Sequence, residues 1–240
     1  MSERTTITEA DEAADEDETQ RTATTGAESV VIALENAGVE KAFGVQGGAI
    51  MPVYDALYDS EIDHFTMAHE QGAAHAADAY GIVSGEPGVA FATSGPGATN
   101  LVTGIADASM DSDPLIALTG QVATDFVGND AFQETDTVGI TQPVTKNNYF
   151  AGDVETVGDD VGEAFALAEA GRQGPTLVDL PKDTTKADLD VQPGQAETPD
   201  TYNPPEKADE VVVEAAAEAL QAAQKPVILS GGGVIKGEAT

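Results

Sequence analysis

The sequence predicts an α/β fold in which a parallel sheet is flanked by helices. Short apolar segments alternate with helical patterns along residues 25–187, as in repeated βαβ units. The segment 114–119 is apolar throughout, which is typical of a strand buried on both faces of a parallel sheet. A glycine-rich turn, Ser94-Gly95-Pro96-Gly97, separates a strand pattern from a helix pattern, at the kind of position where open α/β sheets bind ligands.

The elements of the first half follow from apolar periodicity and glycine. In chain order, the patterns predict a helix over residues 26–37, a strand over 41–45, a helix over 51–57 and a strand over 63–67. In the first helix Val30, Val31 and Leu34 share one stripe, and Gly38 favours a stop. A helix rich in alanine and glycine then follows Glu70, and its small residues allow close packing against a neighbouring element.

The second half continues the alternation. The patterns predict a strand over residues 88–94, a helix that continues over 101–110, a strand over 114–119, a helix over 157–170 and a strand over 175–180. The predicted domain therefore spans residues 25–187.

The flanking segments have a different character. Residues 1–24 are polar and acidic without apolar periodicity, and we predict that they are disordered. Residues 188–206 are rich in proline, glutamine and aspartate and are predicted to be a linker. Residues 207–240 contain a strong helix pattern over 208–223 and a strand pattern over 226–230, which we interpret as the start of a truncated second α/β domain.

The composition is strongly acidic. The chain has 43 acidic and 10 basic residues and a formal net charge of −33 at pH 7. Such a surface repels nucleic acid and anionic membranes, so neither is expected as a partner. The acids are spread along the whole chain, which favours a halophilic, salt-adapted protein over an ordinary acidic one, because molar salt limits charge repulsion to about 3 Å.

The sequence also limits the chemistry and the compartment. It contains no cysteine, which excludes disulfides, thiolate nucleophiles and cysteine-ligated metals. No apolar run approaches the roughly 20 residues of a membrane span. Because Met1-Ser2-Glu3-Arg4 leads into acidic residues and not into an apolar signal core, we predict a cytoplasmic location.

Glu70 is the most informative single residue, because it opens the small-residue helix directly before the glycine turn. A zinc-protease motif would need two histidines four residues apart, whereas His69 and His75 are six apart, about 240° around a helix. No metal site is therefore predicted. Taken alone, Glu70 is explained as a first-turn carboxylate favoured by the helix dipole.

The glycine turn by itself has two interpretations. Its glycines let the backbone approach a ligand closely, and the same residues suit a simple tight turn. The turn is neither G-x-G-x-x-G nor the Gly-Lys-Ser/Thr of a phosphate loop, so Rossmann and P-loop interpretations are weak.

Read together, these segments resemble the large catalytic subunit of acetolactate synthase (acetohydroxyacid synthase), a thiamine diphosphate enzyme, over about residues 25–187. The matching stretches are residues 43–57 (FGVQGGAIMPVYDAL), 69–81 (HEQGAAHAADAYG), 94–100 (SGPGATN), 120–122 (GQV), 130–134 (DAFQE), 145–146 (TK), 171–175 (GRQGP) and 179–183 (DLPKD). Many thiamine diphosphate enzymes share the glutamate helix and the glycine turn, whereas 130–134 together with 179–183 is more specific to acetolactate synthases.

The resemblance implies that residues 25–187 bind the aminopyrimidine ring of the cofactor. Glu70 would hydrogen-bond N1′ of that ring and favour the imino tautomer that makes the ylide. The implied catalytic residues are Glu70, Gln133, Lys182, Phe132 and Gly48. The implied cofactor-binding residues are Gln46, Gly47, Glu70, Thr93, Pro96, Gly97, Asn100 and Arg172, of which Arg172 would contact FAD. Lys182 would pair with a substrate carboxylate; the alternatives are a surface lysine and, for Phe132, core packing.

The implied function is that of an acetolactate synthase catalytic subunit, of which this chain is a fragment. It condenses pyruvate with a second 2-keto acid, such as 2-ketobutyrate, with loss of CO2 in branched-chain amino acid biosynthesis. The resemblance also implies a homodimer or homotetramer, a small regulatory subunit, and Mg2+ bound by a diphosphate domain downstream of this chain. Because family active sites form between subunits, this chain alone is expected to be inactive.

Two departures and two alternatives accompany the resemblance. The family often has proline at the position of Gln46 and an aromatic residue at that of Asn147; both differences concern fine specificity. The first alternative is another thiamine diphosphate carboligase, decarboxylase or oxidase. The second is a non-catalytic fragment that only binds a partner.

Overall fold

A computed structural model gives the structure of the chain and describes residues 22–189, 193, 197–205 and 207–237. Within these residues, six parallel strands form one sheet in the order β2-β1-β3-β4-β6-β5. The strands are β1 (Lys41–Gly44), β2 (Asp63–Thr66), β3 (Gly88–Ala92), β4 (Leu115–Gln121), β5 (Asn147–Phe150) and β6 (Thr176–Pro181). The predicted α/β fold with a parallel sheet is confirmed.

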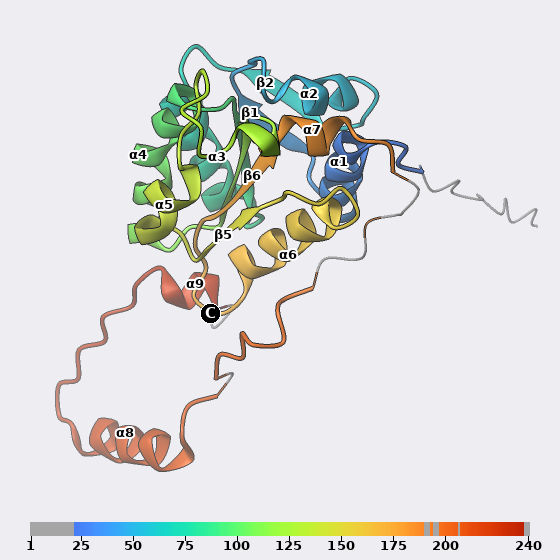
Figure 1. Cartoon of the computed structure of the whole chain (residues 1–240). Coiled ribbons are helices and arrows are strands. Elements are labelled where there is room, and N and C mark those ends of the chain that lie inside the picture. The colour runs from blue at the N-terminus through green and yellow to red at the C-terminus, as the bar shows by residue number, and fades with distance from the viewer. Residues whose placement is uncertain (1–21, 190–192, 194–196, 206, 238–240) are drawn as a thin grey trace, which may run out of the picture.

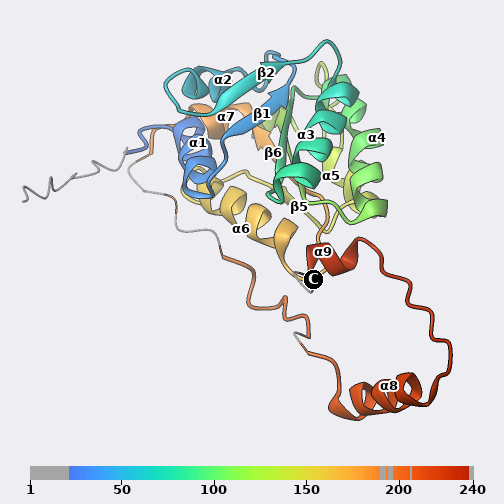
Figure 2. The same cartoon turned by 180° about the vertical axis from the view of Figure 1, so that it is seen from behind.

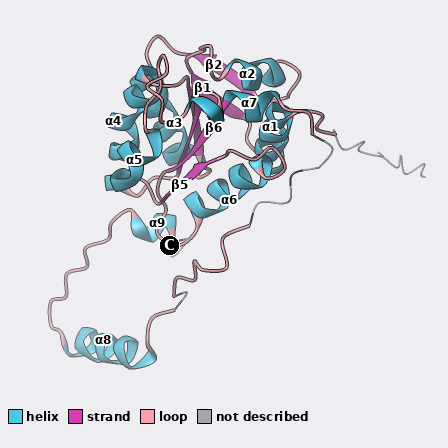
Figure 3. Ribbon diagram, viewed as in Figure 1, coloured by secondary structure: helices cyan, strands magenta, loops and turns pink. Residues whose placement is uncertain are grey.

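Helices cover both faces of this sheet (Figures 1 and 2). One layer contains α1 (Gly26–Asn36), α2 (Met51–Leu57), α6 (Val157–Glu169) and α7 (Lys182–Lys186). The other contains α3 (Glu70–Ser84), α4 (Pro96–Asp111) and α5 (Thr137–Thr141). Two single 3-10 turns, η1 (Thr124–Phe126) and η2 (Gln142–Val144), lie in the connections. In Figure 3 the strands run between the two helical layers, and α8 (Glu210–Ala222) lies apart from both.

The core is divided between the two faces of the sheet. Every residue of β3 and β4 is buried, which marks them as central strands. Val89 and Phe91 of β3 belong to the apolar cluster under α1, α2 and α6. Ala90 and Ala92, with the opposite orientation, belong to the cluster under α3 and α4, as expected from the alternation of side chains along a strand. Small residues on this second face let α3 and α4 lie close to the sheet.

Local sequence signals explain where the helices begin. Thr25 and Glu28 form a capping box at the start of α1, which satisfies two otherwise free backbone N–H groups. The helix predicted over 101–110 begins earlier, at Pro96, because Gly95 acts as the N-cap and proline is favoured in the first helical turn. The helices predicted over 26–37, 51–57 and 157–170 are also confirmed to within one residue.

The strand predicted over residues 226–230 is wrong. These residues adopt no regular secondary structure, because no strand of the described chain lies beside them to provide hydrogen-bond partners. In contrast, β5 was not predicted, since Asn147-Asn148-Tyr149-Phe150 shows no apolar run. It is an edge strand that pairs only with β6, so tertiary pairing creates it.

The flanking segments are described in part. Residues 1–21, most of the segment predicted to be disordered, lie outside the described residues. Ala23 is buried and packs with Ile32 and Leu189, and Thr25 bridges to Asp188. Both ends of the sheet domain therefore meet on the same side. Among the described residues, no helix is both long and apolar enough to cross a membrane.

Candidate functional site

The carboxyl ends of β2 and β3 lead into the two helices that carry the candidate site. Glu70 is the first residue of α3, and the side chain of His69 caps this helix by accepting a hydrogen bond from Gln71 N at 3.1 Å. The Ser94–Gly97 turn leads from β3 into α4. The carboxyl ends of parallel strands lie at the same edge of a sheet, so Glu70 and the glycine turn lie at one edge.

Asn100 connects the two helices. Its Nδ2 donates a hydrogen bond of 3.0 Å to Oε2 of Glu70. Both side chains are partly buried. Oε1 of Glu70 accepts no hydrogen bond from the described residues. One carboxylate oxygen is therefore fixed, and the other remains available to a ligand.

Gly97 lies directly beside that free oxygen. A Cβ atom on Gly97 would lie 3.5 Å from Oε1 of Glu70 and 2.8 Å from Cγ2 of Thr93. Thr93 also fills the space next to Gly47, where a Cβ would collide with its side chain. Its Oγ1 accepts a hydrogen bond of 3.2 Å from Ala49 N. Thr93 thus joins the 46–49 segment to the glycine turn.

A second loop reaches the same turn. Gly95 has a φ of 58°, which favours glycine, and a Cβ there would lie 2.5 Å from the carbonyl oxygen of Gln133. Glu134 holds this loop by accepting hydrogen bonds from the backbone N–H groups of Gly128 and Ala131. These backbone hydrogen bonds also lower the pKa of Glu134. The structure therefore brings Gln133 to the glycine turn, although the two are distant in sequence.

The remaining residues of this edge are open to solvent. Phe132 is 87% exposed, so core packing does not explain this phenylalanine in the described chain. Gly48 and Pro96 are exposed as well, and a Cβ on Gly48 would meet nothing within 4 Å. Gln46 donates a hydrogen bond of 2.7 Å to Thr66 Oγ1 at the end of β2. These residues leave an open surface beside Glu70.

Lys182 lies at the same edge of the sheet but lines a hollow that does not include Glu70. It is the first residue of α7, directly after β6. With residues of α1, α2 and α7 it lines a hollow of about 520 Å³, which also includes Met51, Asp55 and Lys186. Within the described chain, the structure does not bring Lys182 into the contacts around Glu70.

Arg172 lies at the opposite end of the strands from Glu70, where their amino ends meet. It precedes β6, and its Nε donates a hydrogen bond of 2.7 Å to Oγ of Ser112, which precedes β4. The amino ends of parallel strands share one edge, so Arg172 is separated from Glu70 by the length of the sheet. It also lines a hollow of about 430 Å³ with Ser112, Gln173 and Lys236.

Sequence reasoning missed a buried polar network near the Gln133 loop. Asp179 of β6 accepts hydrogen bonds from Thr119 Oγ1 at 2.7 Å and from Gln121 Nε2 at 2.8 Å. Gln121 also donates to the carbonyl of Thr135. Burial raises the pKa of Asp179 to about 7, against the opposite effect of the hydrogen bonds from Thr119 and Gln121. This network depends on the sheet register, which places Thr119 of β4 opposite Asp179 of β6 and which no local sequence pattern indicates.

Comparison with known proteins connects this geometry to a family. Residues 24–140 match the family described as thiamine pyrophosphate enzyme, N-terminal TPP binding domain. The chain is 49% identical over 214 residues to a probable acetolactate synthase large subunit of Methanocaldococcus jannaschii, covering 88% of this chain and 36% of that protein. It is 49% identical over 217 residues to the acetolactate synthase large subunit of Corynebacterium glutamicum, covering 90% of this chain and 34% of that protein.

A third relative gives the same result. The acetolactate synthase isozyme 2 large subunit of Escherichia coli K12 is 48% identical over 209 residues, which cover 87% of this chain and 37% of that protein. The chain thus spans roughly a third of the length of the relatives it matches.

Proposed function

We propose that this chain is part of an acetolactate synthase catalytic subunit, because residues 24–140 match the thiamine pyrophosphate enzyme N-terminal domain and the chain is 49% identical to two acetolactate synthase large subunits over most of its length. The enzyme joins pyruvate to a second 2-keto acid, pyruvate or 2-ketobutyrate, with loss of CO2. This reaction serves branched-chain amino acid biosynthesis.

The residues at the sheet edge fit the pyrimidine part of thiamine diphosphate. The free Oε1 of Glu70 can exchange a proton with a ring nitrogen, and Gly97 leaves room for a flat ring where a side chain would stand. Gln46, Gly47, Thr93, Pro96 and Asn100 form the remaining surface that would hold it. When bound, thiamine diphosphate supplies a nucleophilic carbon and an electron sink.

Glu70 holds and releases the proton in this proposal. Asn100 holds Oε2 with a hydrogen bond of 3.0 Å, so Oε1 is the oxygen through which Glu70 would exchange a proton with a ligand. A carboxyl group that transfers a proton must lie within hydrogen-bond reach of its partner. A fixed orientation maintains that reach without reorganisation during the reaction.

Other residues would contact the substrates. Gln133, held against Gly95, and the exposed Phe132 would border the reacting carbon together with Gly48. The Lys182 ammonium would pair with a 2-keto acid carboxylate, an interaction suited to a point charge. In this chain Lys182 lines a hollow that does not include Glu70. The role of Lys182 therefore requires that the substrate reach from the surface beside Glu70 to Lys182, or that the Gln133 loop move to bring them together.

The remaining parts of the proposal concern the longer protein. Arg172 would contact FAD at the opposite edge of the sheet. Mg2+ would be held by residues outside these 240 residues. The enzyme would form a homodimer or homotetramer and bind a small regulatory subunit, and it would work in a salt-rich cytoplasm.

The observation that carries the proposal is the hydrogen bond from Asn100 to Glu70 next to Gly97. The test uses the full-length protein with thiamine diphosphate, Mg2+ and pyruvate in molar KCl, with products identified by mass spectrometry. Acetolactate is the expected product. Acetaldehyde as the main product would replace this assignment with a decarboxylase, and the absence of any product would favour a non-catalytic role.

A further inference from the structure

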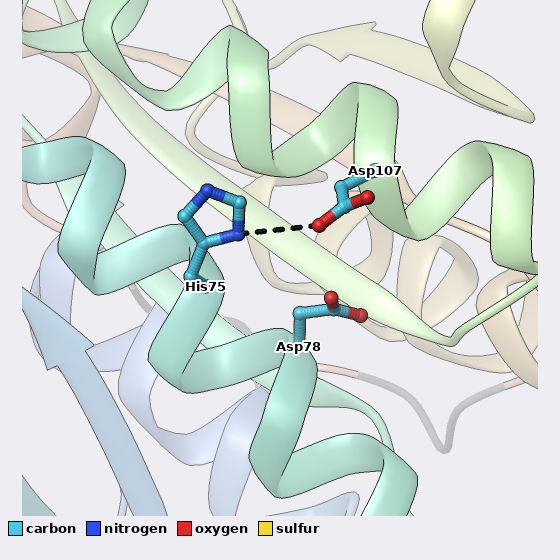
Figure 4. Close-up of side chains that lie close together, drawn as sticks. All are labelled: His75, Asp78 and Asp107. Carbon is cyan, nitrogen blue, oxygen red and sulfur yellow. Dashed lines mark ion pairs between the residues drawn. The ribbon is translucent and has the colours of Figure 1, made fainter.

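Helices α3 and α4 bring three potential metal ligands together beside the contact between the two helices. His75 and Asp78 are one turn apart on α3, and Asp107 projects toward them from α4 (Figure 4). One ligand atom from each residue lies within 4.8 Å of the others. The spacing of His69 and His75 in the sequence does not indicate this cluster, because Asp107 comes from a different helix.

Close packing of the two helices creates the cluster. A Cβ atom on Gly104 of α4 would collide with the Cβ of Ala74 and would lie 3.2 Å from the backbone nitrogen of His75. Asp107 follows Gly104 by one helical turn, just as Asp78 follows Ala74 by about one turn. The two helices run in the same direction, because both connect parallel strands. Side chains one turn beyond the contact therefore meet.

Asp78 forms the floor of the cluster. Asp78 is only 7% exposed. Its Oδ1 is buried and accepts no hydrogen bond from the described residues. Buried carboxylate oxygens are almost always hydrogen-bonded or bound to a metal, so this atom lacks an interaction that the fold should provide.

The surroundings add negative charge. Burial, followed by the nearby carboxylates of Asp113 and Asp107, raises the pKa of Asp78 to about 6, and Asp111 acts in the same direction while His75 opposes them. At this end of α4 in the described chain, Lys236 pairs with Asp113 and with the carbonyl oxygens of Asp111 and Ser112, and Arg172 donates a hydrogen bond to Ser112. Neither of these two cations forms an ion pair with Asp78.

We propose that Nδ1 of His75 and the carboxylates of Asp78 and Asp107 bind one divalent transition-metal cation, such as Zn2+. Nδ1 of His75 lies 3.4 Å from Oδ2 of Asp107, close to the roughly 3.3 Å that separates two ligands of a tetrahedral ion with bonds of about 2.0 Å. The imidazole favours Zn2+ over Ca2+ and Mg2+, which prefer oxygen ligands alone.

The site is accessible on one side. The side chains of His75 and Asp107 are 40% and 55% exposed, so water can complete the coordination. The ion would link α3 to α4 further along both helices than the Glu70–Asn100 hydrogen bond. It would thereby fix the position of these two helices relative to each other. This structural cation is separate from the Mg2+ of the proposed function, and its existence does not depend on that function.

The first test is calorimetric titration of the 240-residue chain with Zn2+ after treatment with a chelator and dialysis, in buffered KCl. One saturable site per chain is expected, which distinguishes it from weak binding to the acidic surface. His75→Gln, Asp78→Asn and Asp107→Asn should each weaken binding by at least about tenfold. His69→Gln on the same helix and Asp111→Asn on α4 are matched controls that should change affinity less than about threefold.

A second measurement uses the wild-type chain alone, so it stands even if a variant fails to fold. The sequence contains only three histidines, and long-range 1H–15N spectra resolve their imidazole nitrogens. One equivalent of Zn2+ should shift the Nδ1 resonance of His75 and leave those of His64 and His69 in place. Absence of saturable binding, equal shifts at all three histidines, or full affinity in Asp78→Asn would each overturn the proposal.

Discussion

Asn100 donates a 3.0 Å hydrogen bond to Oε2 of Glu70 and thereby joins the N-terminal part of α4 to the start of α3 at the carboxyl ends of the strands. The two residues are 30 positions apart. Glu70 begins α3 after β2, and Asn100 is the fifth residue of α4, which follows β3. Their contact leaves Oε1 of Glu70 free beside Gly97. This arrangement leads to the first two predictions.

Glu70→Gln should reduce kcat of the full-length enzyme by a factor of about 10² to 10⁴, because an amide cannot take up and return the proton. The hydrogen-bonding shape is retained, so the free energy of unfolding should change by less than about 1 kcal/mol. Steady-state kinetics and urea denaturation provide the two measurements. Glu86→Gln, which changes an exposed carboxylate after the same helix, is the control, and equal activity in both variants would contradict the role of Glu70.

Asn100→Ala should lower kcat by roughly fivefold, since the loss of one hydrogen bond costs about 1 kcal/mol and the Glu70 carboxylate is no longer held in one orientation. Because Asn100 positions another residue, its pH–rate profile should also shift relative to wild type. Thr99→Ala, one residue earlier and exposed, controls for changes in the helix start. An unchanged profile in Asn100→Ala would show that the contact only stabilises the fold.

Gly97→Ala should destabilise the 240-residue chain by about 1–3 kcal/mol, because the new methyl group would lie 2.8 Å from Cγ2 of Thr93. Adding Thr93→Ser removes that methyl carbon and keeps the hydroxyl that accepts from Ala49, so the double variant should recover most of the lost stability. In the full-length enzyme the double variant should still bind thiamine diphosphate weakly, because the methyl group of Ala at position 97 remains near Oε1 of Glu70.

The control for this pair is Gly72→Ala in the first turn of α3, where a Cβ would meet only Met67 Cε at 3.9 Å. That variant should be as stable as wild type or more stable, by up to about 1 kcal/mol, because alanine favours helix. Urea denaturation gives all four free energies. If the double variant were no more stable than Gly97→Ala, Thr93 would not be the source of the strain.

Asp179 should make the stability of the chain depend on pH. Burial raises its pKa to about 7, above the value of about 3.9 in an unfolded chain. The folded state therefore holds the extra proton, and this contribution is fully present below about pH 4 and lost as the pH rises through 7. The free energy of unfolding should fall by up to about 1.4 kcal/mol per pH unit within that window from this group.

Asp179→Asn tests this sign directly. The stability of the variant relative to wild type should rise between pH 5 and pH 8 and should be constant below pH 4. Asp125→Asn, which changes an exposed aspartate in the 3-10 turn η1, controls for the loss of one negative charge. A difference that does not change with pH would show that Asp179 is ionised throughout.

Local patterns identified most of the domain. The alternation of apolar segments with helical stripes predicted five of the strands and the main helices, because each pattern reflects burial on one or both faces. It failed where structure depends on pairing alone. Asn147–Phe150 becomes a strand because β6 lies beside it, and the apolar residues 226–230 do not, because no described strand does.

The sequence by itself placed Glu70 at a helix start, put a glycine turn after the next strand, and carried the resemblance to acetolactate synthases. The tertiary structure decided which side chains meet. Asn100 reaches Glu70, Gln133 lies against Gly95, and His75 faces Asp107. These contacts depend on how closely α3, α4 and the loop after β4 pack, which small residues such as Ala74 and Gly104 permit and which no local pattern encodes.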